Sequence, residues 1–152
     1  MLIAGAERSV RPDEIIGRAS VIDGDTLEIR GERIRLHGVD APEASQTCQR
    51  SDSSYRCGRD AALYLSDLIG TGTVHCRKRD IDRYGRTVAT CQSAGRDLGE
   101  LLVSAGWALA YTQYSLDYLA AERKAKQAGR GIWAGSFVQP AEYRAERRGG
   151  GN

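Results

Sequence analysis

The sequence predicts a single α+β domain built on a small closed β-barrel. Its 152 residues give room for one domain with a substantial hydrophobic core. Five short segments have the alternation or composition of strands, and three segments with helical spacing are inserted between or after them. With 41% hydrophobic and 28% charged residues, the composition is that of a globular domain. The pattern alone does not distinguish an OB barrel from another small barrel.

The first half of the chain contains three expected strands, at 15–22, 26–30 and 33–39. Gly31-Glu32 is a two-residue connection with glycine first, which suits a type II′ hairpin turn. In the strand that follows, Ile34 and Leu36 share one face, so Arg35 lies on the opposite face. Arg35 can therefore point away from the core and meet a ligand.

The second half alternates helices with two further strands. The Ser- and Cys-containing stretch at 45–59 is expected to be a loop, and the strands at 73–77 and 87–92 are joined by a charged loop. Asp97 followed by Glu100 has the spacing of a capping box. The expected helices follow the apolar spacing and end at glycines, at 61–70, 97–106 and 115–129.

Three parts follow from composition: a flexible lead-in at 1–14, a folded domain at 15–143 and a disordered tail at 144–152, which is charged and then rich in glycine. The lead-in has no apolar run long enough for a signal peptide or a membrane span. Ala4-Gly5-Ala6 resembles the end of a cleavage site, which predicts a trimmed secreted or periplasmic protein and leaves a cytoplasmic location open.

Four carboxylates lie on segments that the first hairpin brings to one end of the barrel: Asp23, Asp25, Asp40 and Glu43. Carboxylate oxygens suit a hard cation such as Ca²⁺ or Mg²⁺, and no Cys or His spacing supports zinc. An EF-hand loop does not match, because residues 23–26 lack its later ligands and its central glycine. Pro42 stiffens the exit from the strand, so the side chains around it are held in fixed directions.

The order of short motifs resembles the staphylococcal nuclease (thermonuclease) family. DGDT at 23–26 is followed by RLHGVDAPE at 35–43, DRYGR at 82–86, AER at 121–123 and GIW at 131–133. The resemblance covers about 15–143, and the motifs are specific in combination. It implies a five-stranded OB-fold barrel with three α-helices. It also implies a Ca²⁺-dependent nuclease that cleaves DNA and RNA with little sequence specificity and leaves 3′-phosphates.

The resemblance assigns a metal site to this end of the barrel. Asp25 and Asp40 would bind Ca²⁺ through carboxylates and Ala41 through its backbone carbonyl, with Asp23 behind these ligands. Ala41 departs from the family, whose best-known members have threonine there. A carbonyl ligand tolerates that change, and only the contacts of the missing hydroxyl are put in doubt.

The resemblance also assigns the catalytic residues. Arg35 and Arg86 would flank the scissile phosphate with planar donor forks, which match the charge that accumulates in the transition state. Glu43 would reach the metal through water and position or deprotonate the attacking water.

Aromatic and basic residues are candidates for binding the substrate. Tyrosine rings stack on bases without sequence preference, and basic side chains attract the backbone of DNA or RNA. The candidates are Arg83, Tyr84, Tyr111 and Tyr114, with the basic run at 77–79 adding general attraction. We expect a monomer that acts on DNA and RNA and has no membrane partner.

A second function class stays open: a non-catalytic module of the same fold that binds nucleic acid or a protein. A pure binding module has no need of all five of the expected ligand and catalytic side chains, which are intact here: Asp25, Arg35, Asp40, Glu43 and Arg86. Their presence favours the enzyme.

The four cysteines form two local pairs along the chain. In an exported protein we would connect Cys48 to Cys57 and Cys76 to Cys91. Four cysteines allow three connectivities, and the sequence does not choose among them rigorously. Free buried thiols are the alternative in a cytosolic protein.

Overall fold

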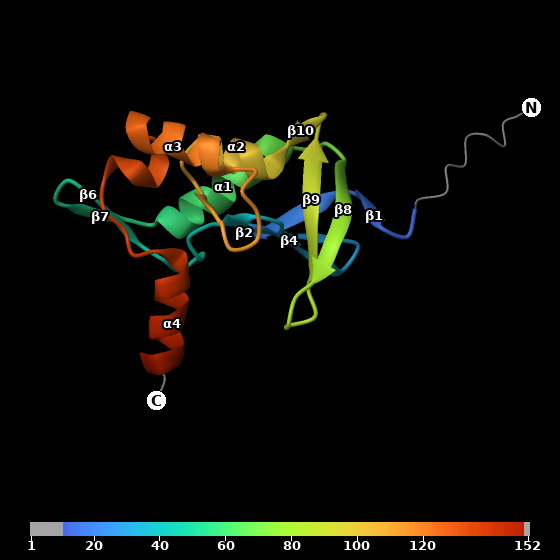
Figure 1. Cartoon of the computed structure of the whole chain (residues 1–152), viewed down its shortest axis with the longest axis horizontal. Coiled ribbons are helices and arrows are strands. Elements are labelled where there is room, and N and C mark those ends of the chain that lie inside the picture. The colour runs from blue at the N-terminus through green and yellow to red at the C-terminus, as the bar shows by residue number, and fades with distance from the viewer. Residues whose placement is uncertain (1–10, 151–152) are drawn as a thin grey trace, which may run out of the picture.

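The computed structural model describes residues 11–150, and the side chains of 11–148. Ala4-Gly5-Ala6, the expected cleavage-like segment, lies outside the described residues. The chain folds as an α+β domain in which a strongly curled sheet is covered by helices on one side (Figure 1).

The main sheet has the order β1-β8-β9-β4-β3-β2, with β10 added beside β9. Only β4 and β9 run parallel, and the other neighbours are antiparallel. The strands are β1 (Glu14–Gly17), β2 (Ala19–Asp23), β3 (Thr26–Ile29), β4 (Glu32–Leu36), β8 (Val74–Ile81), β9 (Thr87–Ser93) and β10 (Arg96–Asp97).

The two ends of this sheet are formed by one continuous segment of chain. β1 and β2 are separated only by Arg18, yet they pair with β8 and β3 at opposite ends of the strand order. The sheet must therefore curl round toward a barrel, which confirms the expected fold class. The first expected strand, 15–22, is divided into two at this bend.

The turn between β3 and β4 differs from the predicted type II′ turn at Gly31-Glu32. Ile29 pairs with Glu32, so the two turn residues are Arg30 and Gly31. Both have positive φ, 52° and 80°, as in a type I′ turn. This turn matches the twist of the flanking strands, which is why Arg30 accepts a left-handed conformation.

Residues 11–150 contain four α-helices where three were expected. They are α1 (Cys57–Ile69), α2 (Leu98–Ser104), α3 (Leu119–Ala128) and α4 (Pro140–Gly150). The Asp97 side chain caps α2 by accepting hydrogen bonds from the amides of Gly99 and Glu100, as predicted. Gly129, in a left-handed conformation, ends α3 as predicted.

The fourth helix corrects the sequence analysis. Residues 144–150 were expected to belong to a disordered tail, whereas they continue α4. Pro140 occupies the first helical position, where its fixed φ is compatible with a helix. The charged residues and glycines near the end of the chain favoured disorder. The helix begins before them, at Pro140, and continues through them.

The core lies between the inner face of the curled sheet and the first three helices (Figure 1). Alternate positions of the strands and one face each of α1 and α2 are fully buried there, including Leu27, Ile29, Ile34, Leu65, Leu98 and Leu102. The opposite positions of β3 and β4 are left free to carry polar groups.

Two short antiparallel pairs extend the barrel at the end where the charged motifs lie. β5 (Val39–Asp40) pairs with β11 (Leu109–Ala110), and β6 (Cys48–Arg50) pairs with β7 (Ser53–Tyr55). The Tyr111 amide also donates to the carbonyl of Gly38 at 2.8 Å. These bonds fix the segment that leaves β4 and carries Asp40.

Both expected disulfides are present in the structure. Cys48–Cys57 joins β6 to the first residue of α1, and Cys76–Cys91 joins directly paired positions of β8 and β9. The first bridge lies beside the loop that carries Glu43, so it also anchors that loop to α1. Among residues 11–150, none of the helices has the length and apolar character needed to cross a membrane.

Candidate active site

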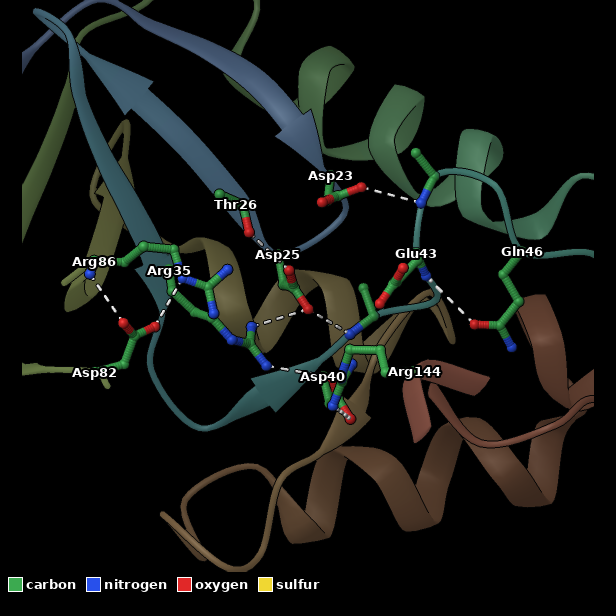
Figure 2. Close-up of polar contacts among 12 residues, drawn as sticks. Asp23, Asp25, Thr26, Arg35, Asp40, Glu43, Gln46, Asp82, Arg86 and Arg144 are labelled. Atoms are coloured by element: carbon green, nitrogen blue, oxygen red, sulfur yellow. Dashed lines mark hydrogen bonds and ion pairs between the residues drawn. The ribbon is translucent and has the colours of Figure 1, made fainter. Parts of the chain in front are cut away.

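The charged motifs meet at one end of the barrel around Arg35 (Figure 2). Arg35 Nη1 lies 2.9 Å from Asp25 Oδ2, and Nη2 lies 3.3 Å from Asp40 Oδ1. Asp25 Oδ2 also accepts a 2.9 Å hydrogen bond from the amide of Ala41. The guanidinium of Arg35 thus lies between two carboxylates, those of Asp25 and Asp40, which are 10 and 5 residues from it in sequence.

The strand pattern positions Arg35 as predicted. It lies opposite Thr26 of β3 and Val88 of β9, while Ile34 and Leu36 are buried in the core. Its side chain is only 13% exposed. Nη1 has no hydrogen-bond partner among the described residues, because its contact with Asp25 is an ion pair without hydrogen-bond geometry. Two carboxylates therefore hold this guanidinium in a partly buried position.

Asp40 is paired with a residue that the sequence analysis did not consider. Arg144 of α4 donates from Nη1 to Oδ1 at 2.9 Å and from Nη2 to Oδ2 at 3.3 Å. Burial raises the pKa of Asp40, the negative charge of Asp25 adds to the rise, and the Arg144 guanidinium opposes it. Asp25 and Asp40, called the carboxylate pair below, thus lie close enough together that a nearby positive charge stabilises their ionised forms.

Asp23 supports the loop that follows β5 and does not join the carboxylate pair. Its Oδ1 accepts a 3.0 Å hydrogen bond from the amide of Ala44 (Figure 2). Burial raises the pKa of Asp23, and the like charge of Asp25 adds to the rise. Asp23 thus fixes the backbone beside Glu43.

Glu43 is half-buried at the edge of the same group of residues. Its amide donates to Gln46 Oε1 at 3.4 Å, and its Oε1 lies 3.4 Å from Nη1 of Arg147. Gln46 is 1% exposed and also donates from Nε2 to the carbonyl of Val138 at 2.6 Å. Gln46 therefore joins the Glu43 turn to the segment that leads into α4, a role that the sequence analysis missed.

Gly58, at the start of α1, allows the helix to pack directly against the Glu43 turn. Its amide donates to the carbonyl of Gln46 at 3.1 Å. A Cβ at Gly58 would overlap the carbonyl oxygen of Glu43 and lie 3.0 Å from the carbonyl carbon of Ala44. Any larger residue would push the backbone of Glu43 away, so Gly58 helps to determine where Glu43 lies.

Arg86 lies on the same face of the sheet as Arg35 but points elsewhere (Figure 2). It is two residues before Val88, which lies opposite Arg35, so the period-2 rule places both arginines on one face. Its Nε donates to Asp82 Oδ2 at 2.7 Å. The structure therefore does not place the Arg86 guanidinium on the carboxylate pair.

Asp82 holds the loop that carries Arg86. Its Oδ1 accepts hydrogen bonds from the amides of Tyr84 and Arg86, both at 2.9 Å. Burial acts to raise the pKa of Asp82, but these amides and the Arg86 guanidinium outweigh it and hold the pKa below its usual value. The carboxylate therefore stays ionised, and Arg86 keeps its direction.

A cleft of about 570 Å³ runs between Arg35 and the loop that carries Arg86, and Asp25, Asp40 and Glu43 are not among its lining residues. Both arginines line it, and so do all four expected substrate-binding residues: Arg83, Tyr84, Tyr111 and Tyr114. Tyr84 and Tyr114 are 63% and 60% exposed, and the Tyr111 and Tyr114 rings pack edge to face with centroids 4.8 Å apart. Arg83 lies over the Tyr84 ring, 5.2 Å from its centroid. The cleft thus combines partly buried and exposed cations with accessible aromatic faces.

In the basic run 77–79, Arg77 was expected to end a strand, and Lys78 and Arg79 were expected in the charged loop, whereas all three lie in β8. β8 continues to Ile81, so these residues belong to the strand and alternate in direction. None of the three lines the cleft. Lys78 lies 3.9 Å from Glu32, and Arg79 donates to Thr90 at 3.2 Å. The loop between β8 and β9 is shorter than expected and contains the DRYGR motif.

Comparison with known proteins gives a family match over most of this structure. Residues 33–135 match the family model described as "Staphylococcal nuclease homologue", about two thirds of the chain. The matched region contains Arg35, Asp40, Glu43 and Arg86, whereas α4 lies beyond it.

Several curated proteins are similar over most of this chain. "Succinoglycan biosynthesis protein ExoI" of Rhizobium meliloti is 42% identical over 141 residues, which cover 90% of this chain and 72% of that protein. An "Uncharacterized endonuclease" of Haemophilus influenzae is 32% identical over 84% of this chain and 71% of its own length. "Probable staphylococcal-like nuclease CAN1" of Oryza sativa is 34% identical over 84% of this chain but only 37% of its own length.

Proposed function

This chain belongs to the staphylococcal nuclease homologue family, and from that premise we propose that it is a Ca²⁺-dependent nuclease. It would hydrolyse phosphodiester bonds in DNA and RNA with little sequence specificity and leave 3′-phosphates. The observation that carries the proposal is the cleft, which is lined by the partly buried Arg35, by Arg86 and by three tyrosine rings. These groups recognise a phosphate and the faces of bases, and none reads a base edge.

The carboxylate oxygens of Asp25 and Asp40 are ligands of the kind that a hard cation takes. Asp25 and Asp40 offer carboxylate oxygens next to the backbone of Ala41, and two guanidiniums already lie against Asp40. Among the described residues no group of three Asp, Glu, His or Cys side chains could hold a metal ion. The carbonyl of Ala41 would therefore have to complete the ligand set, as the family resemblance implies. Bound Ca²⁺ would act as a Lewis acid on a phosphate oxygen.

The remaining chemistry falls to Arg35 and Arg86, which line the cleft, and to Glu43. Arg35 would donate to the phosphate from a buried position, and Arg86 would add a second planar fork once the substrate is bound. Glu43, fixed by Gln46 and by the close approach of Gly58, would hold the attacking water. Because Asp25 and Asp40 already hold Arg35 in place, its guanidinium would stabilise the charge of the transition state at little cost in rearrangement.

We place the protein outside the cytoplasm, in a secreted or periplasmic location. Two disulfides in a chain of this size support that placement, because such bridges persist in oxidising compartments. We further propose that it acts as a monomer on nucleic acid.

Removal of the metal tests the proposed function. We expect cleavage of plasmid DNA and of RNA to stop with chelator and return with Ca²⁺. A sparse ligand set predicts weak affinity, with Kd of roughly 10⁻⁴–10⁻³ M. Asp40→Ala should abolish Ca²⁺ binding in calorimetry, whereas Asp67→Ala, on the exposed side of α1, should leave it unchanged. Full activity in chelator, or normal Ca²⁺ binding by Asp40→Ala, would refute the calcium assignment.

Gly58→Ala tests the position of Glu43. The added methyl group overlaps the backbone of Glu43, so we expect kcat to fall about 10²-fold, the loss typical of a displacement of about 1 Å. Circular dichroism would establish that the variant is folded. The control is Gly72→Ala, beyond the other end of α1, where the new Cβ meets nothing closer than 3.2 Å. Equal activity in both variants would show that the Glu43 turn does not depend on this contact.

A further inference from the structure

We propose that α4 forms one wall of the substrate site and that Arg148 binds a phosphate of the nucleic-acid strand next to the scissile phosphate. This inference rests on the proposed nuclease function. It concerns a helix that lies beyond the region matched by the family model.

One face of α4 is turned to the cleft. Ala141, Arg144 and Arg148 all line it, and their spacing of three and then four residues puts them in one stripe along the helix. The cleft residues contributed by β4, by the loop between β8 and β9 and by the Tyr111–Tyr114 turn line the same volume. α4 therefore faces the residues proposed to bind the substrate.

The neighbouring face of α4 is docked on the loop that carries Glu43. The hydroxyls of Tyr143 and Ser45 share a 2.9 Å hydrogen bond, and Arg147 donates to Ser45 Oγ at 2.9 Å. Together with the bidentate pair between Arg144 and Asp40, these contacts fix the rotation of the helix. The direction of Arg148, one turn beyond Arg144, follows from that docking.

Arg148 carries a positive charge that no described carboxylate neutralises. Its side chain is exposed, and it takes part in none of the ion pairs among the described side chains. By contrast, Arg144 is held by Asp40, and Arg86 by Asp82. A free guanidinium at the wall of a cleft whose floor is proposed to bind one phosphate is placed to bind another.

The position of Arg148 also predicts which substrates it helps to bind. Four residues of helix rise about 6 Å, so Arg148 lies about that far along α4 from Arg144, whose partner Asp40 belongs to the proposed metal site. A polynucleotide strand that continues past the cleaved bond would reach Arg148, whereas a small substrate with a single phosphodiester would not. We therefore expect the arginine to favour polynucleotides over small diesters.

Binding of a labelled single-stranded oligonucleotide in chelator, followed by fluorescence anisotropy against salt concentration, tests the phosphate contact. Arg148→Ala should weaken binding by up to about fivefold at low salt. It should also lower the slope of log K against log salt by about 0.7, the value for one phosphate contact on a single strand. Arg123→Ala, an exposed arginine of α3 that does not line the cleft, is the control and should change neither quantity. Identical salt slopes for the two variants would overturn the proposal.

Cleavage in Ca²⁺ gives a second, independent measurement. For Arg148→Ala, kcat/KM should fall with an oligonucleotide and stay unchanged with a nitrophenyl phosphodiester. An equal loss on both substrates would contradict a contact outside the scissile phosphate. If the wild-type protein cleaved neither substrate, the proposed nuclease function would fail, while the salt slopes would still decide the role of Arg148.

Discussion

Replacing Arg86 with lysine is expected to lower kcat by about 10²–10³-fold, roughly 3–4 kcal/mol of transition-state stabilisation. Lysine keeps the positive charge but loses the planar fork. In the structure Asp82 holds Nε of Arg86 at 2.7 Å and so orients the rest of the guanidinium, which an ammonium group cannot imitate. Arg35→Lys should behave similarly, because Arg35 is the buried fork between Asp25 and Asp40.

The measurement is steady-state cleavage of an oligonucleotide in saturating Ca²⁺, with kcat and KM determined separately. A residue that serves the transition state lowers kcat, whereas one that serves uniform binding raises KM. The matched control is Arg79→Lys, because Arg79 is exposed on β8 and does not line the cleft. A kcat of Arg86→Lys within a few-fold of the wild type would remove Arg86 from the proposed mechanism.

Glu43→Gln is expected to lower kcat by about 10²–10⁴-fold, the contribution typical of a positioned general base. Glutamine keeps the size of the side chain and its hydrogen bonding but removes the charge that orients or deprotonates water. Substrate affinity should change little, or increase slightly, because a negative charge near the phosphate is lost. The contact with Arg147, at 3.4 Å, lies at the surface and contributes little to stability.

Single-turnover rates at high enzyme concentration would separate this effect from product release. Glu142→Gln, an exposed position of α4 outside the cleft, provides the control for loss of one negative charge. If Glu43→Gln and Arg86→Lys both kept nearly full kcat, the alternative of a non-catalytic module that binds nucleic acid or protein would take the place of the enzyme.

The sequence alone predicted the features that depend on local pattern. Alternation along β3 and β4 placed Leu27 and Ile34 in the core and Arg35 on the opposite face, because side chains alternate along any strand. Asp97 was recognised as the cap of α2 because capping needs only residues close in sequence. The two cysteine pairs joined nearby segments, and the structure confirms them.

The tertiary structure decided what depends on contacts between distant segments. Arg144 meets Asp40 across 104 residues, and no periodicity in the sequence indicates such a contact. The role of Gly58 likewise depends on how closely α1 approaches the Glu43 turn.

The same reason explains why α4 was mistaken for a disordered tail. A polar helix of this length gains little from its own hydrogen bonds. α4 is instead stabilised by docking through Tyr143, Arg144 and Arg147 onto a loop about one hundred residues earlier in the chain. Local sequence thus determined the barrel and the identity of the charged motifs. Packing of the end of the chain against those motifs, a long-range event, determined the shape of the cleft.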